Sequence, residues 1–386
     1  MKQTVMVKLQ PTAAERATLA ETLSRCNELA GLVADVAYRH RDRGTGRIER
    51  LAVLHARVYE QLRHAGLGAQ AAVRVIGKVT RAYATLYGQV DAGMLRGRRK
   101  ARAFAKPIRF RSGAAQAYDD RCLSWDYSAR TVSIWTVEGR RKGIKFAASK
   151  RDIDLLSKCR KGESALIERD GNFYLAAAVE VPEAKPIEPV DFVGVDRGIV
   201  NLATTSDGRN FQGKELERYR RRQIRVRADL QRKSSKAAKR KLKQRNRKER
   251  RHNSHVNHRI AKEIVSEAER TGRGIALEEL GGIRERVRLN RSQRDRISNW
   301  PFSQLGRYIA YKAQIAGVPV IEVDARHTSQ MCPLCHHTGR GNRKTRDQFE
   351  CGGCRLAGPA DLIAAVNVRA RARVAWAVSQ GSGASA

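Results

Sequence analysis

Two pairs of cysteines in the last quarter of the chain have the spacing of a metal site. They are Cys332-Pro-Leu-Cys335 and, after fifteen intervening residues, Cys351-Gly-Gly-Cys354. Thiolate pairs at this spacing each hold one side of a tetrahedral zinc ion, and four protein ligands leave no coordination position for water. The pattern predicts one structural, non-catalytic Zn²⁺. Arg343 and Arg346 lie among the basic residues between the pairs, so we expect this ribbon also to contact nucleic acid.

Three acidic residues stand where chemistry at phosphate would need them. Asp196 closes the apolar segment FVGVD (192–196), Glu278 lies in a second apolar segment, and Asp361 opens an apparent helix. A carboxylate in an apolar strand costs free energy unless a partner such as a divalent cation compensates it. Each acid alone is as readily a surface group or a helix cap. Three converging carboxylates, however, are what a phosphodiester site with two Mg²⁺ ions about 3.5–4 Å apart requires.

The overall charge points to a polyanionic partner. The 386 residues include 77 Lys or Arg and 39 Asp or Glu, which gives a net charge of +38, and 41% of the residues are hydrophobic. This length and apolar content predict folded domains, and the excess positive charge favours nucleic acid, with a membrane surface as the weaker alternative. We find no segment with the roughly 20 apolar residues of a membrane span and no signal peptide, so we expect a cytoplasmic protein.

Two segments concentrate this charge. Residues 96–111 hold eight basic residues in sixteen positions with two interleaved phenylalanines, and 218–251 hold eighteen basic residues and two acids. A solvated helix face is the alternative for the second segment, but its basic excess is too one-sided for i,i+4 pairing. The predicted nucleic-acid contacts are Arg98, Arg99, Lys100, Lys106, Arg109, Arg111, Arg221, Arg222, Arg240, Lys241 and Arg346.

The elements that must position these residues fall into three blocks. Alternating apolar residues predict a strand at 3–9, and Thr12 with Glu15 makes a capping box for the first helix of a helical region that reaches about residue 95. About 75 β-rich residues follow, and the N-terminal strand would complete them as a small barrel or sandwich. Beyond a linker at 182–189, strands alternate with helices.

Several segments carry a family resemblance. They are GVDRGIVNLATTSDG (194–208), IALEEL (275–280), NWPFSQLGRYIAYKAQIAG (299–317), the TSQMCPLC…CGGC ribbon (328–354) and ADLIAAVN (360–367). Together they resemble the RuvC-type nuclease domain of TnpB proteins, the transposon-encoded relatives of type V CRISPR effectors. The resemblance covers about 186–375, whereas the earlier regions resemble the family in their order rather than in motifs.

The resemblance implies a multidomain α+β fold. Its parts would be a helical recognition lobe, a small β-barrel wedge domain and an α/β ribonuclease-H-like RuvC domain with an inserted zinc ribbon. The implied boundaries are 1–12 for the N-terminal wedge strand, 13–105 for the helical lobe, 106–185 for the wedge barrel, 186–325 for the first part of the RuvC domain with basic helices at 214–270, 326–358 for the target-nucleic-acid-binding zinc ribbon, 359–377 for the C-terminal RuvC helix and 378–386 for a disordered tail.

The resemblance also implies roles for single residues. Asp196, Glu278 and Asp361 would be catalytic and bind two Mg²⁺ ions, and the four cysteines would bind one Zn²⁺. Arg346 falls where the family usually has an arginine, which implies a nucleic-acid or active-site contact. Glu279 stands where the family commonly has aspartate and would support the site. Ile363 departs from the family, which usually has asparagine at this position.

The implied function is RNA-guided cleavage of DNA next to a short duplex motif. Its partners would be a guide RNA and double-stranded target DNA, with one protein monomer on one RNA and association with the nucleoid when DNA is bound. A compact type V CRISPR effector would share this chemistry. A guide-dependent repressor would usually have lost one acid, and all three are present. A DNA transposase could use the same triad, but the ribbon between the second and third acids favours the nuclease.

Overall fold

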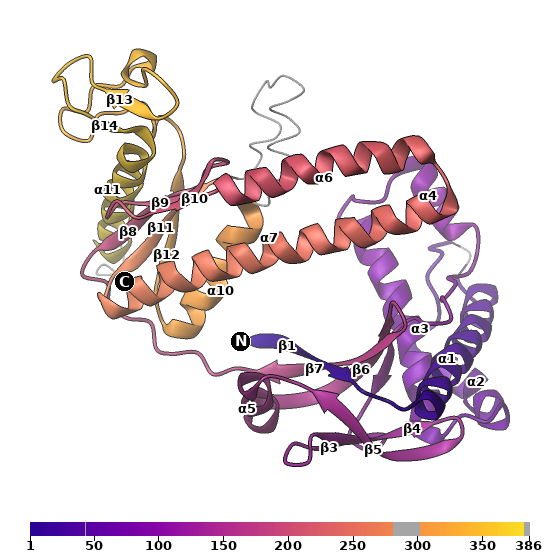
Figure 1. The fold of residues 1–386 in the computed structure, drawn as a ribbon. Coiled ribbons are helices and arrows are strands. Elements are labelled where there is room, and N and C mark those ends of the chain that lie inside the picture. The colour runs from indigo at the N-terminus through magenta and orange to yellow at the C-terminus, as the bar shows by residue number, and fades with distance from the viewer. Residues whose placement is uncertain (43, 281–301, 382–386) are drawn as a thin grey trace. The chain divides into compact units, whose positions relative to one another are not determined.

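The structure, a computed structural model, describes residues 1–42, 44–280 and 302–381 (Figure 1). It divides into an N-terminal unit, Met1–Val181, and a C-terminal unit, Pro182–Ala386, which are described separately. The start of the segment 299–317 and residues 382–386 of the predicted tail lie outside the described residues. Within the described residues, no helix is long and apolar enough to cross a membrane.

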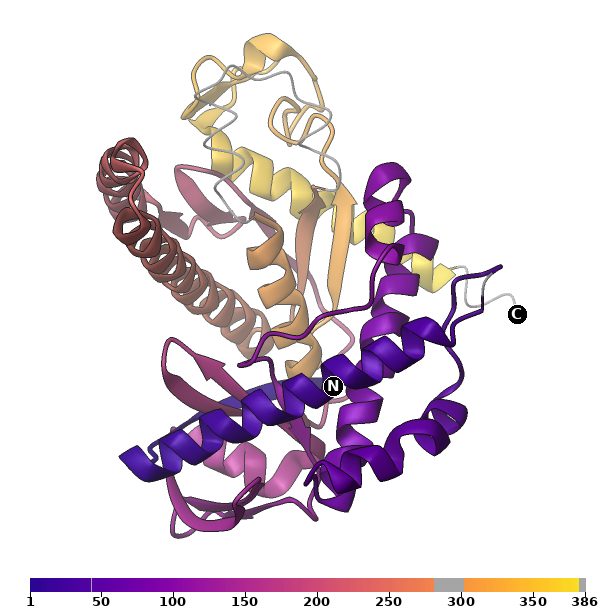
Figure 2. The ribbon, with the colours of Figure 1, turned by 90° about the vertical axis from the view of Figure 1, so that its right-hand side faces the viewer.

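Four helices form the first part of the N-terminal unit: α1 (Ala13–Arg39), α2 (Leu51–His64), α3 (Ala69–Asp91) and α4 (Gly97–Phe104). Thr12 and Glu15 cap α1 as predicted: the Glu15 amide donates to Thr12 Oγ1 at 3.3 Å and the Thr12 amide to Glu15 Oε2 at 2.8 Å. Apolar side chains at helical spacing pack α3 against both α1 and α2 (Figure 2).

A seven-stranded, nearly closed barrel sheet completes this unit, in the order β2-β6-β7-β1-β5-β4-β3. Its elements are β1 (Lys2–Leu9), β2 (Gln116–Tyr118), β3 (Leu123–Asp126), β4 (Thr131–Thr136), β5 (Gly139–Ala147), α5 (Lys150–Cys159), β6 (Arg160–Arg169) and β7 (Asn172–Glu180). The N-terminal strand pairs with β7 along most of its length and with β5 at its end. It therefore completes the sheet, as its alternating pattern predicts.

The C-terminal unit is built on a five-stranded mixed sheet in the order β10-β9-β8-β11-β12. The strands are β8 (Phe192–Asp196), β9 (Asn201–Thr205), β10 (Asn210–Gln212), β11 (Gly274–Glu279) and β12 (Val320–Asp324). β9 is antiparallel to both β8 and β10, whereas β11 is parallel to both β8 and β12. The central strand β8 is buried from Phe192 to Val195, as expected of a strand covered on both faces.

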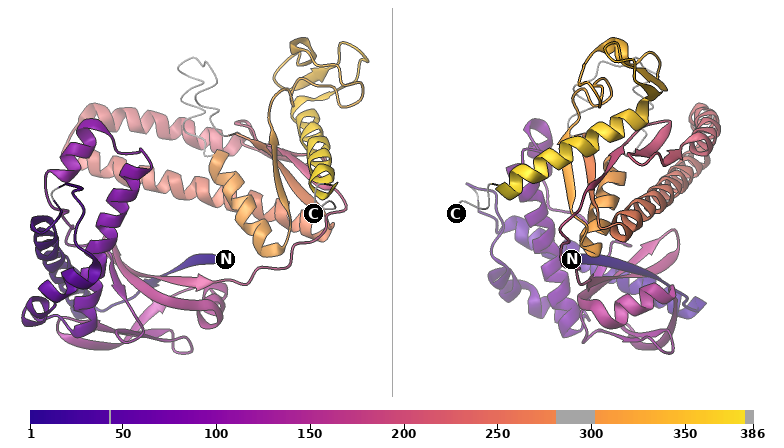
Figure 3. Two further views of the ribbon diagram at one scale, coloured as in Figure 1. Left: turned by 180° about the vertical axis from the view of Figure 1, so that it is seen from behind. Right: turned by 90° about the vertical axis from the view of Figure 1, so that its left-hand side faces the viewer.

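Helices cover both faces of this sheet (Figure 3). In the described residues of this unit, the α-helices are α6 (Lys214–Lys233), α7 (Lys236–Arg270), α10 (Phe302–Ala316) and α11 (Ala360–Gly381). α7 and α10 pack on the face that carries Val193, Val195 and Leu277, and α11 packs on the face that carries Phe192 and Ala276. Successive strand residues point to opposite faces, so even-numbered positions of β8 and β11 face α11.

The basic run 218–251 forms an antiparallel helix pair, α6 and α7. Ser234 ends α6 in the left-handed conformation (φ 48°), and Ser235 caps α7 by accepting from the Ala238 amide at 3.1 Å. Arg227 Nη2 donates to Glu249 Oε2 at 2.7 Å and ties the two helices together. One of the two acids of the run is therefore used inside the pair.

The ribbon packs on the first turn of α11. It contains a short helix, η1 (Arg340–Asn342), and the antiparallel strands β13 (Gln348–Glu350) and β14 (Ala357–Pro359). Ile363 is 7% exposed and belongs to a small core with Cys332, Phe349 and Cys351. Ile363, which stands where the family usually has asparagine, thus helps to pack the ribbon against α11.

The last helix is longer than predicted. The sequence predicts that this helix ends at 377 and that a disordered tail begins at 378, but α11 continues to Gly381. The reason is local: residues 374–380, VAWAVSQ, include no proline or glycine that would stop a helix.

Candidate metal centres

Asp196 and Glu278 lie side by side at the carboxyl ends of two neighbouring parallel strands. The ladder between β8 and β11 pairs Val195 with Leu277, so the next residue of each strand is one of the two acids. Both face α11 by the alternation of the strands. The charge of Glu278 acts on Asp196. The sheet thus brings together two acids that are far apart in the sequence.

Asp361 joins them from the first turn of α11. This helix lies directly on β8 at Gly194, where an added Cβ would lie 2.7 Å from the Arg369 amide nitrogen and would overlap the Ala365 carbonyl oxygen. Only glycine permits this approach, and it fixes the height of α11 above Asp196. Asp361 is close enough to Asp196 for its negative charge to act on that carboxyl group.

The electrostatics of the pair favour a bound cation. Burial first, and then the charges of Glu278 and Asp361, raise the pKa of Asp196 well above its usual range. Burial also raises the pKa of Glu278, although Thr328 and Arg197 oppose this shift. Among the described residues, only the cysteine Sγ atoms and not these three carboxylates all lie within 4.8 Å of one another, but a divalent cation between the carboxylates would relieve this repulsion.

Neutral and basic side chains orient the carboxylates. Thr328 Oγ1 donates to Glu278 Oε1 at 2.6 Å, and Asn201 Nδ2 donates to Asp361 Oδ2 at 2.8 Å. On α11, the side-chain Nδ2 of Asn367 donates to the carbonyl oxygens of Thr328 and Met331 at 2.7 and 2.8 Å, which holds the segment between β12 and the first cysteine pair against the helix.

The ribbon contributes an arginine to Asp361. Arg343 Nη2 lies 3.1 Å from Asp361 Oδ1 and also donates to the Arg346 carbonyl oxygen at 2.7 Å. The side chain of Arg346 instead approaches Asp347 at 3.6 Å, so its predicted contact with nucleic acid or the active site stays a prediction. Glu279 is exposed, and its supporting role is likewise still a prediction.

The coupling of these acids predicts an unusual stabilising substitution. A carboxyl group with a raised folded-state pKa destabilises the metal-free fold progressively as pH rises above its ordinary value near 4. Asp196→Asn removes this cost, so we expect the metal-free protein at pH 8 to gain about 1 kcal/mol, or roughly 2–4 °C in melting temperature. The gain should vanish as pH falls toward 4. Thermal melting of both metal-free proteins at pH 8 and at pH 4 tests this, and a variant that melts no higher than the wild type at pH 8 would contradict it.

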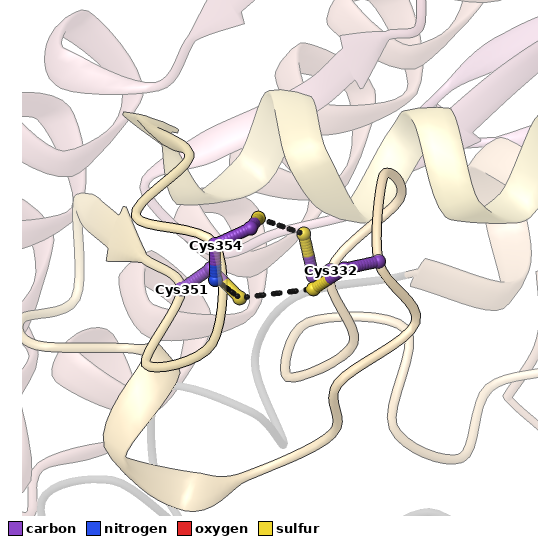
Figure 4. Close-up of side chains that lie close together, drawn as sticks. Cys332, Cys351 and Cys354 are labelled. Carbon is purple, nitrogen blue, oxygen red and sulfur yellow. Dashed lines mark hydrogen bonds between the residues drawn. The ribbon is translucent and has the colours of Figure 1, made fainter.

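The four cysteines converge on a second centre. All four Sγ atoms lie within 4.8 Å of one another, and Cys335 Sγ lies 3.4 Å from Cys351 Sγ. Cys332 Sγ lies 3.5 Å from Cys354 Sγ (Figure 4). This cluster is compatible with a tetrahedral metal ion such as zinc and confirms that the predicted ligands come together.

Two similar turns shape the cluster. The residue after each cysteine pair, His336 or Arg355, has a positive φ (58° and 63°), and its amide donates to the carbonyl oxygen of the first cysteine of that pair. The amides of Cys354 and Gly353 donate to Cys351 Sγ at 3.5 and 3.4 Å. These hydrogen bonds, that of Cys354 first, lower the pKa of Cys351 to about 6, which favours the thiolate that metals bind.

The predicted nucleic-acid contacts are all exposed, but some are already paired. Arg109 Nη1 lies 2.8 Å from Asp35 Oδ2, and Arg221 Nε lies 3.2 Å from Glu217 Oε1. The three predicted contacts of α4 belong to a helix with no buried residue. Lys106, Arg111, Arg222, Arg240 and Lys241 are exposed as well. The structure places these residues at the surface, and their binding role remains a prediction.

Two family models match the C-terminal unit and its boundary. The one described as "Probable transposase" (OrfB_IS605) matches residues 176–280, and the one described as "Cas12f1-like, TNB domain" matches residues 302–368. The TnpB-like protein MJ0751 of Methanocaldococcus jannaschii is 34% identical over 112 residues, 29% of this chain and 40% of that protein. Over these segments the chain is similar to TnpB-like proteins and to the probable-transposase family. Its carboxylates and cysteines lie in the segments that carry the family match.

Other relatives have been named for an activity. The chain is 27% identical over 221 residues to "Putative RNA-guided DNA endonuclease InsQ" of Escherichia coli K12, covering 52% of this chain and 54% of that protein. It is 36% identical over 114 residues to "CRISPR-associated endodeoxyribonuclease Cas12f1" of Sulfoacidibacillus thermotolerans, covering 29% and 26%. The chain thus spans about half or less of the curated relatives it matches.

Solved structures show the same kind of fold. The protein of a Cas12f1-sgRNA-target DNA complex has a TM-score of 0.61 at 12% identity, covering 96% of this chain and 98% of that one. The mini-RNA-guided endonuclease CRISPR-Cas_phi3 has a TM-score of 0.59 at 11% identity, covering 97% and 92%. At these identities the likeness shows a shared mixed α/β multidomain fold.

Proposed function

We propose that this protein is an RNA-guided DNA endonuclease of TnpB type, which hydrolyses DNA phosphodiester bonds next to a short duplex motif. The observation that carries the proposal is the convergence of Asp196, Glu278 and Asp361 from two strands and a helix. The net charge of +38 supports an extended nucleic-acid partner, because base pairing with the guide would read the sequence while the protein holds the backbone. The names of the relatives support the same activity.

The arrangement of the C-terminal sheet also supports a nuclease domain. A mixed five-stranded sheet, with its acids at the ends of the central parallel pair and on the helix that packs across it, fits a ribonuclease-H-like RuvC domain. The predicted helical lobe, wedge barrel, and inserted ribbon would then hold guide RNA and target DNA. We expect one monomer on one RNA, in the cytoplasm and on the nucleoid when DNA is bound.

The three carboxylates would hold two Mg²⁺ ions. When bound, such ions activate water and stabilise the leaving oxygen of the scissile phosphate. The chain's own residues set the geometry: Thr328 orients Glu278, and Asn201 orients Asp361. Arg343 of the ribbon pairs with Asp361, and its guanidinium could pair with a phosphate oxygen instead. Arg346, beside it, would contact the nucleic acid that the ribbon holds.

The cysteine cluster would hold one structural Zn²⁺. We expect Cys332→Ser to lower zinc content from about one ion per chain toward zero and to lower the melting temperature with it, since a closed thiolate site contributes folding free energy. Cys159→Ser, outside the cluster, is the matched control and should change neither. Metal analysis and thermal melting make the test, and an unchanged zinc-to-protein ratio in Cys332→Ser would overturn the assignment.

The helix pair α6–α7 would bind nucleic-acid phosphates. Alanine at both Arg240 and Lys241 should weaken guide RNA binding and reduce the slope of log K against log salt by about 1.5, since each lost phosphate contact removes about 0.7–0.9. Alanine at Lys150 and Arg151 of α5, which are basic and exposed but outside the predicted contacts, should leave the slope unchanged. Equal slopes for the two double variants would contradict a specific role of the helix pair.

The RNA that the protein carries tests the guided function. Expression with its flanking genomic DNA, purification at moderate salt and sequencing of the bound RNA should yield one discrete species ending in a short segment from beyond the element. Heterogeneous host RNA that washes off with salt would contradict the proposal and favour a transposase, the description that one family model carries. A type V effector would also retain a discrete RNA, but a repeat-derived one from a CRISPR array.

A further inference from the structure

A buried arginine, Arg197, adjoins the two strand carboxylates. Arg197 directly follows Asp196, at the point where the ladder between β8 and β11 has ended with Val195 and Leu277. Its guanidinium Nη2 donates to the backbone carbonyl oxygen of Glu278. This hydrogen bond therefore links β8 and β11 just beyond their last paired residues.

Arg197 lies on the opposite face of the sheet from the carboxylates. It follows Val195 by two residues, so it shares the face covered by α10, whereas Asp196 and Glu278 face α11. Only 7% of Arg197 is exposed. It reaches Glu278 through the backbone, and the carboxylate oxygens of the site stay available to a metal.

Helix α10 is shaped around this side chain. A Cβ at Gly306 would overlap Nη1 of Arg197, so glycine leaves the space that the guanidinium occupies. Among the described residues, Nε of Arg197 is buried without a hydrogen-bond partner. Burying an incompletely paired guanidinium costs stability, and a functional gain would explain why a fold retains it.

The charge of Arg197 is set among acids from three strands. Asp196, Glu278 and Glu322 of β12 all act on it electrostatically. Its positive charge therefore opposes the mutual repulsion of Asp196 and Glu278 from behind the sheet. A residue that supports metal ligands from outside the first coordination sphere typically changes metal affinity or activity by about 10–100-fold.

We propose that Arg197 is a positioning residue, which fixes the spacing of Asp196 and Glu278 by tying the end of β8 to the carbonyl of Glu278, with Gly306 supplying the room it needs. This inference rests on the proposed function, because it assigns Arg197 to the same metal site. It names a residue pair, Arg197 and Gly306, that acts on the site from the α10 side.

The first test measures how Mg²⁺ activates DNA cleavage by the guide complex. We expect Arg197→Met to cut about 10–100-fold more slowly, to need a different Mg²⁺ concentration for half-maximal rate, and to bind guided target DNA as the wild type does. Arg197→Lys, which keeps the charge but loses the planar fork, should recover part of the rate. A wild-type rate and Mg²⁺ dependence in Arg197→Met would overturn the inference.

A double-mutant cycle separates positioning from general destabilisation. Gly306→Ala should slow cleavage when Arg197 is present, because the new methyl group displaces the guanidinium. In an Arg197→Ala background the space is free, so Gly306→Ala should have little further effect, and the two changes should be non-additive. Additive losses that track the melting temperature would show a merely structural role and would overturn the inference.

A readout without cleavage distinguishes this inference from the proposed function. The protein alone should melt higher with Mg²⁺, and Arg197→Met should reduce that shift. If the wild type melts higher with Mg²⁺ but cuts no DNA, the nuclease proposal fails while the positioning role is still decided by the shift. An equal Mg²⁺-dependent shift in the wild type and Arg197→Met would overturn the positioning role.

Discussion

Replacing Asp196 by alanine is expected to abolish DNA cleavage while leaving guided DNA binding within about twofold of the wild type. The lost carboxylate belongs to the metal site and is not itself a phosphate contact. Metal ions supply several kcal/mol of transition-state stabilisation, and about 4 kcal/mol corresponds to roughly a thousandfold in rate. Single-turnover cleavage of a matched duplex and a filter-binding assay with the same guide complex measure the two effects.

The matched control for this variant is Glu269→Ala. Glu269 is an exposed acid of α7 outside the carboxylate site, so its loss should leave both cleavage and binding unchanged. If Asp196→Ala loses binding as much as cleavage, Asp196 acts through the fold or through the nucleic acid and not through a metal.

Gly194→Ala should strongly destabilise the C-terminal unit. The new Cβ would overlap the Ala365 carbonyl oxygen, and neither the central strand nor the helix backbone can yield as a flexible side chain does. We expect a loss of about 3 kcal/mol or more, together with loss of cleavage, because α11 carries Asp361. Thermal melting and cleavage rates give the two measurements.

A second glycine provides the comparison. Gly88 lies in α3, and a Cβ there would meet nothing within 4 Å. Gly88→Ala should therefore be neutral or stabilising by about 0.5–1 kcal/mol, since alanine is the better helix residue. Similar melting temperatures for Gly194→Ala and the wild type would mean that α11 does not rest on β8 as described.

A second contact anchors α11 to the start of β8. Arg373 donates to Asp191 through Nε and Nη2 at 2.6 and 2.7 Å, and Arg369 also pairs with it. Burial alone would raise the pKa of Asp191, but the hydrogen bonds from these two arginines outweigh burial and lower it. The close approach at Gly194 and the ion pairs of Asp191 together hold α11, which carries Asp361, in place on the sheet.

The parts of the site that the sequence predicted are those with a local signal. An acid at the end of an apolar run, such as Asp196, can be recognised from the sequence because a carboxylate in a strand of apolar residues needs a compensating partner. The cysteine pairs can be recognised because two Cys-x-x-Cys pairs at this spacing are typical of a metal site. The N-terminal strand was predicted from its alternation, and its position between β7 and β5 was found only in the fold.

The remaining parts depend on contacts between distant segments. Arg197 meets Gly306 only because α10 packs across the end of β8, and neither residue type signals this. Arg343 and Arg346 are both basic ribbon residues, so composition could not tell which one approaches Asp361. The Asn201 contact to Asp361 likewise joins residues 160 positions apart.

The most direct test of the account is cleavage of a supercoiled plasmid by the purified protein with its copurified RNA. One plasmid carries the segment that matches the end of that RNA, and a second carries the same segment scrambled. We expect Mg²⁺-dependent linearisation of the matched plasmid only, with no product in EDTA or with Asp196→Ala. Equal cutting of both plasmids, or cutting that survives EDTA, would contradict guided, metal-dependent hydrolysis at the three carboxylates.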